Sequence, residues 1–191
     1  MALIDLPART VRARIVYYGP AFGGKTTNLR QIAARVPSDA RGNLSSLEGD
    51  DDRTLFLDDL PLDLGDVGGW RVRVHLSSVP GQARFERTRI AVLQGADGVV
   101  FVADSAPARQ EANAESFTEL RRNLAAAGQD TARFPVVLQA NKRDLPDSVP
   151  LAELQVALDA AEVPLVSSVA TTGEGVFEAL RAACRSVAAV L

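Results

Sequence analysis

The chain has 191 residues, 47% of them apolar and 24% charged, and a formal net charge of −3. This length and composition are typical of one folded domain and exclude a disordered chain. The negative charge disfavours nucleic-acid binding through a basic surface, and the longest apolar run, 98–103, is far shorter than the roughly 20 residues that a membrane helix needs.

Strands and helices are expected to alternate along the chain. In order, the sequence predicts a strand over 11–18, a helix over 26–36, strands over 55–60 and 70–78, a helix from beyond Gly81 to about 93, a strand over 98–104, a helix over 110–127, a strand over 134–140, a helix over 151–161, a strand over 164–168 and a helix over 175–190. Such alternation predicts a mostly parallel sheet covered on both faces, with ligands at the carboxyl ends of the strands.

Two segments depart from this alternation. Residues 37–54 are rich in Ser, Asp and Gly, which predicts a long exposed loop of a length typical of functional loops. The two strands that follow are joined through Gly65 and the Gly68-Gly69 pair and are expected to form an antiparallel hairpin. His75 lies on the polar face of the second strand, where we expect a structural or solvated histidine rather than a catalytic one.

Residues 19–26, with the sequence GPAFGGKT, match the P-loop pattern GxxxxGK[ST] between an expected strand and an expected helix. Glycines in such a loop let backbone N–H groups and the helix N-terminus point at phosphate oxygens. Lys25 can reach the β- and γ-phosphates, and the Thr26 hydroxyl can bind magnesium. A glycine-rich turn without a ligand is the plainer alternative. The expected phosphate-binding residues are Gly19, Ala21, Phe22, Gly23, Gly24, Lys25, Thr26 and Thr27.

Residues 141–144, with the sequence NKRD, match the NKxD box that selects guanine. The Asp144 carboxylate can accept hydrogen bonds from guanine N1–H and the 2-amino group, whereas adenine offers an acceptor and a bare carbon there. Sites built on such pairs discriminate by factors of about 10⁴. Lys142 can lie along the base, and Asn141 can brace the P-loop. Taken alone, these residues could also be a polar exit from a strand.

Two weaker observations agree with a nucleotide site. Only two of the 21 basic residues are lysines, and both, Lys25 and Lys142, lie in these motifs. A coding preference would explain the excess of arginine but not the places where lysine remains. After the last expected strand, Val169, Ala170 and Thr171 are expected to contact guanine, with the Ala170 amide facing its carbonyl; a plain turn is the alternative.

Residues 77–82 lie where Ras-like proteins carry the DxxGQ motif of switch II. We expect the Gly81 N–H to bind the γ-phosphate and Gln82 to orient the attacking water, although Gln82 could instead be a polar residue that opens a helix. Ser78 replaces the aspartate that usually holds magnesium through water. Asp58, on the neighbouring expected strand, could take its place.

Arg53 and Thr54 close the long polar loop. Thr54 can complete magnesium coordination when the γ-phosphate draws the loop inward, which converts hydrolysis into a change of shape. The expected metal ligands are therefore Thr26 and Thr54. Arg53 could act as an arginine finger in cis, a role worth about 10³ to 10⁵ in rate, or be a solvated arginine beside an acidic run. We expect the catalytic residues to be Arg53 and Gln82.

Together these motifs predict a single small G-protein domain of the Ras-like, P-loop NTPase type over residues 1–191. The expected fold has three α/β layers, with a mostly parallel sheet of about six strands, one antiparallel hairpin strand and helices on both faces. The expected ligands are GTP or GDP and Mg²⁺.

The chain resembles the MglA-type bacterial Ras-like GTPases of gliding motility and cell polarity over nearly its whole length. The resemblance is carried by the segments YYGP at 17–20, RTLF at 53–56, VPGQ at 79–82 and FVADS at 101–105, and by the missing switch II aspartate. It implies a slow GTPase that toggles between GTP and GDP states, a Roadblock-fold (MglB-like) activator, downstream effectors and enrichment at a cell pole.

In that family switch I is remodelled with a shift of the second strand, and an intrinsic arginine completes catalysis when the activator docks. Arg53 and Gln82 occupy the matching positions. The Gly23-Gly24 pair departs from the Ser-Gly pair that is more usual there. The acidic stretch at 49–52 is this chain's own version of the segment.

Three other functions fit part of the pattern. A scaffold that stays bound to GTP and recruits partners without hydrolysis remains open. A small-molecule kinase would need an arginine-rich lid and gives no reason for the NKxD box. An ATP-driven machine would need to bind ATP, which Asp144 disfavours.

The beginning of the chain has neither the basic segment of a signal peptide nor a glycine at position 2 for myristoylation. Cys184, the only cysteine, can form no internal disulfide and lies too far from the end for prenylation. We expect a cytoplasmic protein without a direct membrane anchor, monomeric on its own, that acts through protein partners.

Overall fold

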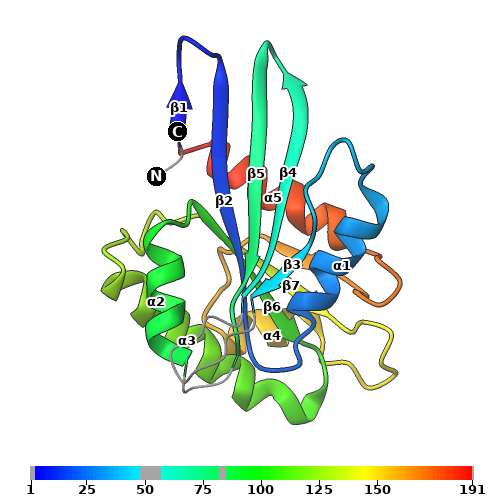
Figure 1. The fold of residues 1–191 in the computed structure, drawn as a ribbon. Coiled ribbons are helices and arrows are strands. Elements are labelled where there is room, and N and C mark those ends of the chain that lie inside the picture. The colour runs from blue at the N-terminus through cyan, green and yellow to red at the C-terminus, as the bar shows by residue number, and fades with distance from the viewer. Residues whose placement is uncertain (1–2, 48–56, 82–84, 191) are drawn as a thin grey trace.

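The computed structural model describes residues 3–47, 57–81 and 85–190. Within these residues eight strands form one sheet in the order β3-β4-β5-β2-β6-β7-β8, with β1 paired to β2 beside this path. The strands are β1 (Leu3–Asp5), β2 (Thr10–Tyr18), β3 (Ser45–Leu47), β4 (Leu57–Val67), β5 (Trp70–Ser78), β6 (Gly98–Asp104), β7 (Val136–Asn141) and β8 (Leu165–Ser167). The helices are α1 (Lys25–Arg35), α2 (Glu86–Gln94), the 3-10 helix η2 (Pro107–Arg109), α3 (Gln110–Ala126), α4 (Leu151–Ala157) and α5 (Val176–Ala188) (Figure 1).

The central strand of the sheet is β2, which pairs in parallel with β5 on one side and β6 on the other. β7 and β8 continue the parallel arrangement beyond β6, whereas β4 runs antiparallel to β5. This confirms the predicted mostly parallel sheet with an antiparallel hairpin strand. The short antiparallel strands β1 and β3 add to the strands that the sequence predicts. Three residues are too few to show the two-residue periodicity of a strand.

The sequence misplaces the end of β4, which continues well beyond residue 60. Pro61 and Gly65 explain the error, because proline and glycine usually mark a strand end. Here the pairing register with β5 shifts just after Asp63, and this bulge accommodates Gly65 at a φ of 76°. The expected uninterrupted loop over 37–54 is also wrong at 45–47, where β3 pairs with β4.

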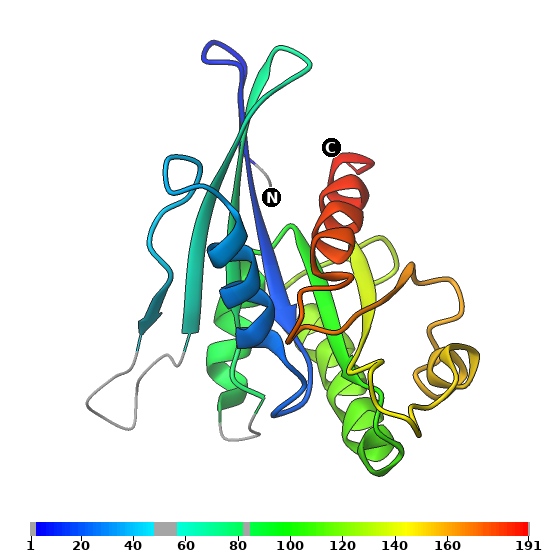
Figure 2. The same cartoon turned by 90° about the vertical axis from the view of Figure 1, so that its right-hand side faces the viewer.

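Alternate residues of β2 enter two separate apolar clusters. Ile15 and Tyr17 pack with residues of α1 and α5, whereas Val16 and Tyr18 pack with residues of α2, α3 and α4. Because side chains alternate across a strand, α1 and α5 cover one face of the sheet and the other helices cover the opposite face (Figure 2). Every residue of β6 is buried, as expected for the middle of a parallel sheet covered on both faces.

The sheet differs between the two ends of its strands. The β1–β2 and β4–β5 turns extend beyond the helices at one edge, and the loop at 19–24, which follows β2, lies at the other (Figures 1 and 2). The carboxyl ends of β6, β7 and β8 meet at that second edge, since they run parallel to β2. In the part of the chain that the structure describes, no helix is long and apolar enough to cross a membrane.

Candidate nucleotide-binding site

The loop at 19–24 leaves β2 and ends at Gly24, the residue before α1. Gly19 and Gly24 adopt φ values of 139° and 106°, which side chains rarely tolerate. A Cβ at Gly19 would meet the carbonyl of Val102 on β6, and a Cβ at Gly24 would meet the side-chain amide of Asn141. The loop can therefore lie this close to β6 and β7 only with glycine at both positions.

The tip of the loop is tightly turned and faces solvent. The Gly23 N–H donates a hydrogen bond to the Pro20 carbonyl at 3.2 Å, and Phe22 adopts a φ of 64° with its side chain 85% exposed. Gly24 provides no side-chain cap for α1, so the N–H groups of the first turn, which includes Thr27, stay available to an anion. The loop has the backbone geometry that a phosphate group requires.

Lys25 begins α1 and folds back over the loop. Its side chain is buried, and Nζ donates hydrogen bonds to the carbonyls of Gly19 at 2.9 Å and Pro20 at 2.7 Å. Burial, and then the positive charge of Arg89, lower the pKa of Lys25 to about 8, while Asp58 acts in the opposite direction. The ammonium group thus lies inside the loop and donates to two neutral carbonyls, and a phosphate would bind it more strongly.

Three oxygen-bearing side chains meet beside Lys25. Asp58 lies opposite Ser78 in the β4–β5 pairing, and its Oδ2 accepts hydrogen bonds from Ser78 Oγ at 2.8 Å and from Thr26 Oγ1 at 2.5 Å. The structure therefore brings Asp58 to the P-loop threonine, as the strand pairing suggested. Hydroxyl and carboxylate oxygens are the ligand types that Mg²⁺ prefers.

Asn141, at the end of β7, joins the P-loop to the segment after β8. This buried side chain donates from Nδ2 to the Gly23 carbonyl at 2.8 Å. Its Oδ1 accepts hydrogen bonds from the Ala170 N–H at 2.9 Å and from Ser168 Oγ at 3.2 Å. The Ala170 amide, which we expect to face a guanine carbonyl, is thus bonded to Asn141 here.

The remaining expected base-binding residues surround Asn141. Lys142 adopts a φ of 66°, and Asp144 is exposed beyond it. Val169 is buried, and Thr171 is exposed with its carbonyl accepting a hydrogen bond from Gln31 of α1 at 2.9 Å. Both segments lie on the same side of the loop at 19–24.

Gly81 lies against the P-loop from the opposite side. A Cβ at this position would collide with the backbone of Pro20 and Ala21, so only glycine allows so close an approach. The backbone of Gly81 therefore lies next to the loop. Of the other expected switch residues, Arg53, Thr54 and Gln82 lie outside the described residues.

Residues 2–187 match the model of the ADP-ribosylation factor family. The chain belongs to this family. Over 187 residues it is 47% identical to "Mutual gliding-motility protein MglA" of Myxococcus xanthus (strain DK1622), with 98% of this chain and 96% of that protein covered. The resemblance to MglA-type GTPases is thereby confirmed, and the chain is a small GTPase of the ADP-ribosylation factor family.

The structure adds two residues to the site that the motifs did not indicate. Asp104, at the buried end of β6, accepts a hydrogen bond from Lys142 Nζ at 2.6 Å, and Arg109 of η2 donates to the Ala21 carbonyl at 2.8 Å. Asp104 lies opposite Asn141 in the β6–β7 register, so strand pairing could have indicated it. No local pattern indicates Arg109. In this member of the ADP-ribosylation factor family, these contacts fix the lysine of the NKxD box and the tip of the P-loop.

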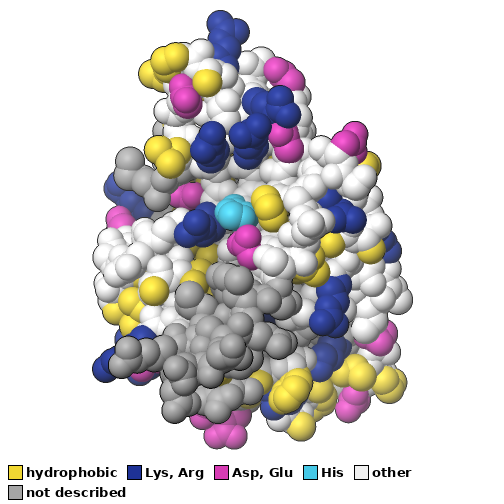
Figure 3. Space-filling model, in the orientation of Figure 1, with side chains coloured by type: hydrophobic (Ala, Val, Ile, Leu, Met, Phe, Trp, Pro, Cys, Tyr) yellow, Lys and Arg dark blue, Asp and Glu magenta, His cyan; other side chains and the backbone are white. Residues whose placement is uncertain are grey.

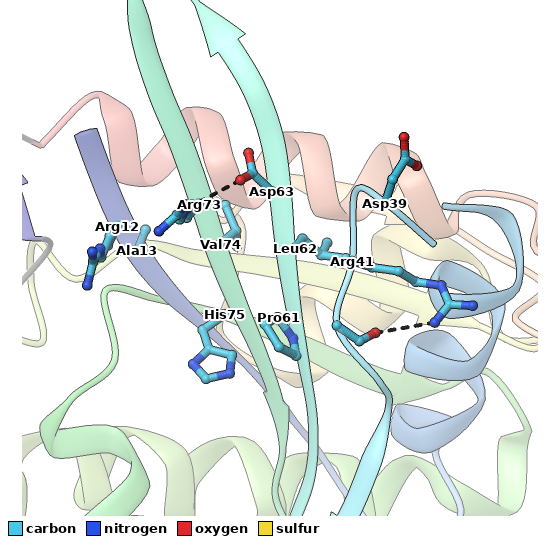
Figure 4. Close-up of a pocket in the computed structure, with 11 residues that line it drawn as sticks. Arg12, Ala13, Asp39, Arg41, Pro61, Leu62, Asp63, Arg73, Val74 and His75 are labelled. Carbon is cyan, nitrogen blue, oxygen red and sulfur yellow. Dashed lines mark hydrogen bonds and ion pairs between the residues drawn. The ribbon is translucent and has the colours of Figure 1, made fainter. Parts of the chain in front are cut away.

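His75 lies on β5, on the opposite face of the strand from Val74, which is buried in the apolar cluster with α1 and α5. Its Nε2 lies 2.8 Å from Asp59 Oδ2, and Figure 3 shows it among arginine and acidic side chains. A hollow of about 380 Å³ opens beside it (Figure 4). Arg73 pairs there with Asp63 at 3.3 Å. These paired charges fit the structural role that we expect for His75.

Proposed function

We propose that the chain is a GTP-binding molecular switch that forms one G domain over residues 1–191 and hydrolyses GTP slowly. The observation that carries this proposal is the position of Asn141. Its side chain bonds the Gly23 carbonyl at 2.8 Å and the Ala170 amide at 2.9 Å. One buried side chain thus joins the phosphate loop to both segments that would hold guanine.

In this proposal each side of the pocket has its own task. The backbone of residues 19–27 and Lys25 bind the phosphates, and the Gly81 N–H binds the γ-phosphate. Asp144 selects guanine, while Lys142, held by Asp104, lies along the base. Only a nucleotide whose phosphates fit the loop and whose base is guanine binds tightly.

The residues present also fit magnesium. Thr26 would bind the ion directly, and Asp58 would hold it through water in place of the switch II aspartate that Ser78 replaces. Thr54 would complete the coordination in the GTP state. Magnesium held by these residues would supply positive charge that offsets the negative charge of the phosphates.

For hydrolysis we propose that Gln82 orients the attacking water and Arg53 stabilises the transferring phosphoryl group, with a Roadblock-fold activator that arranges both. The relative from Myxococcus xanthus is named as a gliding-motility protein. By analogy we propose that this switch regulates cell polarity or gliding motility from the cytoplasm at a cell pole, through effectors that bind one nucleotide state.

Calorimetry with GDP, a non-hydrolysable GTP analogue and ATP, each with magnesium, tests the binding. We expect uptake of both guanine nucleotides and no detectable uptake of ATP. Asp144→Asn should weaken both guanine nucleotides at least about 100-fold, because a guanine N–H then faces an amide. Asp147→Asn, an exposed change in the same loop, is the matched control. Equal binding of ATP and GTP by the folded protein would refute the proposal.

Single-turnover hydrolysis, with and without a Roadblock-fold partner, tests the switch. Arg53→Ala and Gln82→Leu should bind GTP and hardly turn it over, even with the partner. Turnover at the unmodified rate in either variant would remove that residue from the mechanism. Unchanged GTP after prolonged incubation with the partner would instead indicate a scaffold that recruits partners without hydrolysis.

A further inference from the structure

Arg89 of α2 is one of the largest fully buried side chains in the described part of the chain, with 1% of it exposed. A buried charge is costly unless it is paired and hydrogen-bonded. Two of its partners come from different segments. Nη2 donates to Glu119 Oε1 on α3, and Nη1 donates to the Pro80 carbonyl at 3.2 Å. The guanidinium therefore links α2 and α3 to the segment that follows β5.

The bond to Pro80 has a consequence for the next residue. Gly81 follows directly and packs so closely on the P-loop that a Cβ there would collide with the backbone of Pro20 and Ala21. The Pro80 carbonyl and the Gly81 N–H belong to one planar peptide unit, so the bond from Arg89 to that carbonyl also holds the Gly81 backbone.

The position of Gly81 bears on which nucleotide binds. In the proposed function its N–H binds the γ-phosphate, which GTP carries and GDP lacks. A displaced Gly81 should therefore weaken GTP more than GDP.

We propose that Arg89 is a positioning residue that makes the site prefer GTP to GDP, by holding Gly81 at the P-loop. This inference rests on the proposed function, because it assumes a guanine nucleotide in the pocket. It assigns to a buried residue of α2 a part of the selection that the motifs alone would give to Gly81.

Arg122 of α3 offers a matched control. It joins the same two helices, with Nη2 2.7 Å from Glu86 and 4.0 Å from Glu119, but its side chain is 67% exposed. Exposed ion pairs contribute little to stability. Replacing Arg122 thus removes a cation from the α2–α3 contact without removing the bond to Pro80.

The test measures the dissociation constants of GDP and of a non-hydrolysable GTP analogue, with magnesium, for the full chain and for Arg89→Met and Arg122→Met. Methionine keeps much of the arginine volume without its charge. We expect Arg89→Met to weaken the GTP analogue about 10- to 100-fold and GDP far less, which moves the ratio toward GDP. Arg122→Met should leave the ratio unchanged.

Circular dichroism establishes which variants fold. If Arg89→Met does not fold, Arg89→Lys, which keeps the charge but not the planar fork, should move the ratio in the same direction by a smaller factor. Equal weakening of both nucleotides, or a ratio that moves toward GTP, would show that Arg89 is only structural. A full-length chain that binds neither nucleotide would refute the proposed function, and this inference with it, whereas a change in the variants alone concerns only Arg89.

Discussion

The two sides of the candidate pocket are built from different interactions. On the base side, the neutral side chain of Asn141 bonds the Gly23 carbonyl, the Ala170 amide and Ser168. On the phosphate side, charged groups bond neutral neighbours: Lys25 donates to backbone carbonyls, and Asp58 accepts from two hydroxyl groups.

This difference indicates which side is preformed. The Asn141 bonds join backbone groups of separate segments, so they hold the loops together whether or not a nucleotide is bound. The hydrogen bonds of Lys25 and Asp58 go to neutral groups, and a charged group forms a stronger hydrogen bond with a phosphate or a closer contact with a cation. Changes on the base side should therefore affect every nucleotide, and changes on the phosphate side should depend on magnesium, phosphate number and pH.

The largest effect should come from Asn141→Ala, which removes three buried hydrogen bonds at once. We expect GDP and a GTP analogue to bind at least about 100-fold more weakly, by similar factors, because buried groups left unsatisfied cost about 1–3 kcal/mol each. Calorimetry measures both affinities. Asn123→Ala is the control, because Asn123 is also buried but bonds the Tyr18 hydroxyl, at 3.0 Å, on the face of the sheet that α2, α3 and α4 cover. A large difference between the two nucleotides would contradict a purely preformed base side.

A somewhat smaller effect is expected at Gly24, which lies between the two sides. Gly24→Ala would place a side chain at a φ of 106° and against the Asn141 amide. We expect a loss of about 2–3 kcal/mol in the free energy of unfolding, from the left-handed conformation and the displaced amide. Urea unfolding measures it.

Gly68→Ala is the matched control for this change. Gly68 has a φ of 62° in the β4–β5 turn, and nothing lies within 4 Å of a Cβ there. It should cost only about 1 kcal/mol. Equal losses in the two variants would mean that Asn141 moves aside freely, and the base side would then be less rigid than its hydrogen bonds suggest.

Much of this contrast follows from the sequence. The P-loop and NKxD motifs predict the residues on both sides of the candidate pocket. The alternation of strands and helices predicts that the strands end at one edge of the sheet, and β6 begins and ends where its apolar run predicts. The position of Asp58 next to Ser78 could also be predicted, because the β4–β5 hairpin brings the two residues opposite each other. In these cases a local pattern, together with a pairing rule, fixes the neighbour.

What could not be predicted depends on packing between distant segments. Arg89 lies on a helix whose sequence gives no sign that an arginine faces the interior, and Arg109 reaches the P-loop from η2 across 88 positions of the chain. The continuation of β4 through Pro61 was missed because pairing with β5 outweighs the local preference of proline. Such contacts are decided by tertiary structure and leave no periodicity.

A more moderate effect on the phosphate side is expected from Asp58→Asn. The amide would keep a hydrogen bond to a hydroxyl but lose the charge that attracts magnesium, so nucleotide binding should require about tenfold more magnesium. Titration of magnesium at fixed GDP measures this. Asp59→Asn is a sharp control, since Asp59 lies on the opposite face of β4 and bonds His75 and Ser77. Unchanged magnesium dependence in Asp58→Asn would exclude Asp58 from the metal site.

The smallest expected effect is a change in the number of protons bound when the nucleotide binds. With its pKa lowered to about 8, Lys25 is about half neutral at pH 8 in the free protein, and a bound phosphate should raise that pKa and make it fully charged. Nucleotide binding should then take up about half a proton at pH 8 and almost none at pH 6.5, and affinity should fall as pH rises above 8. Calorimetry in buffers of different ionisation enthalpy measures the uptake. A binding enthalpy that does not depend on the buffer at pH 8 would mean that Lys25 takes up no proton when the nucleotide binds. The phosphate side would then be as preformed as the base side.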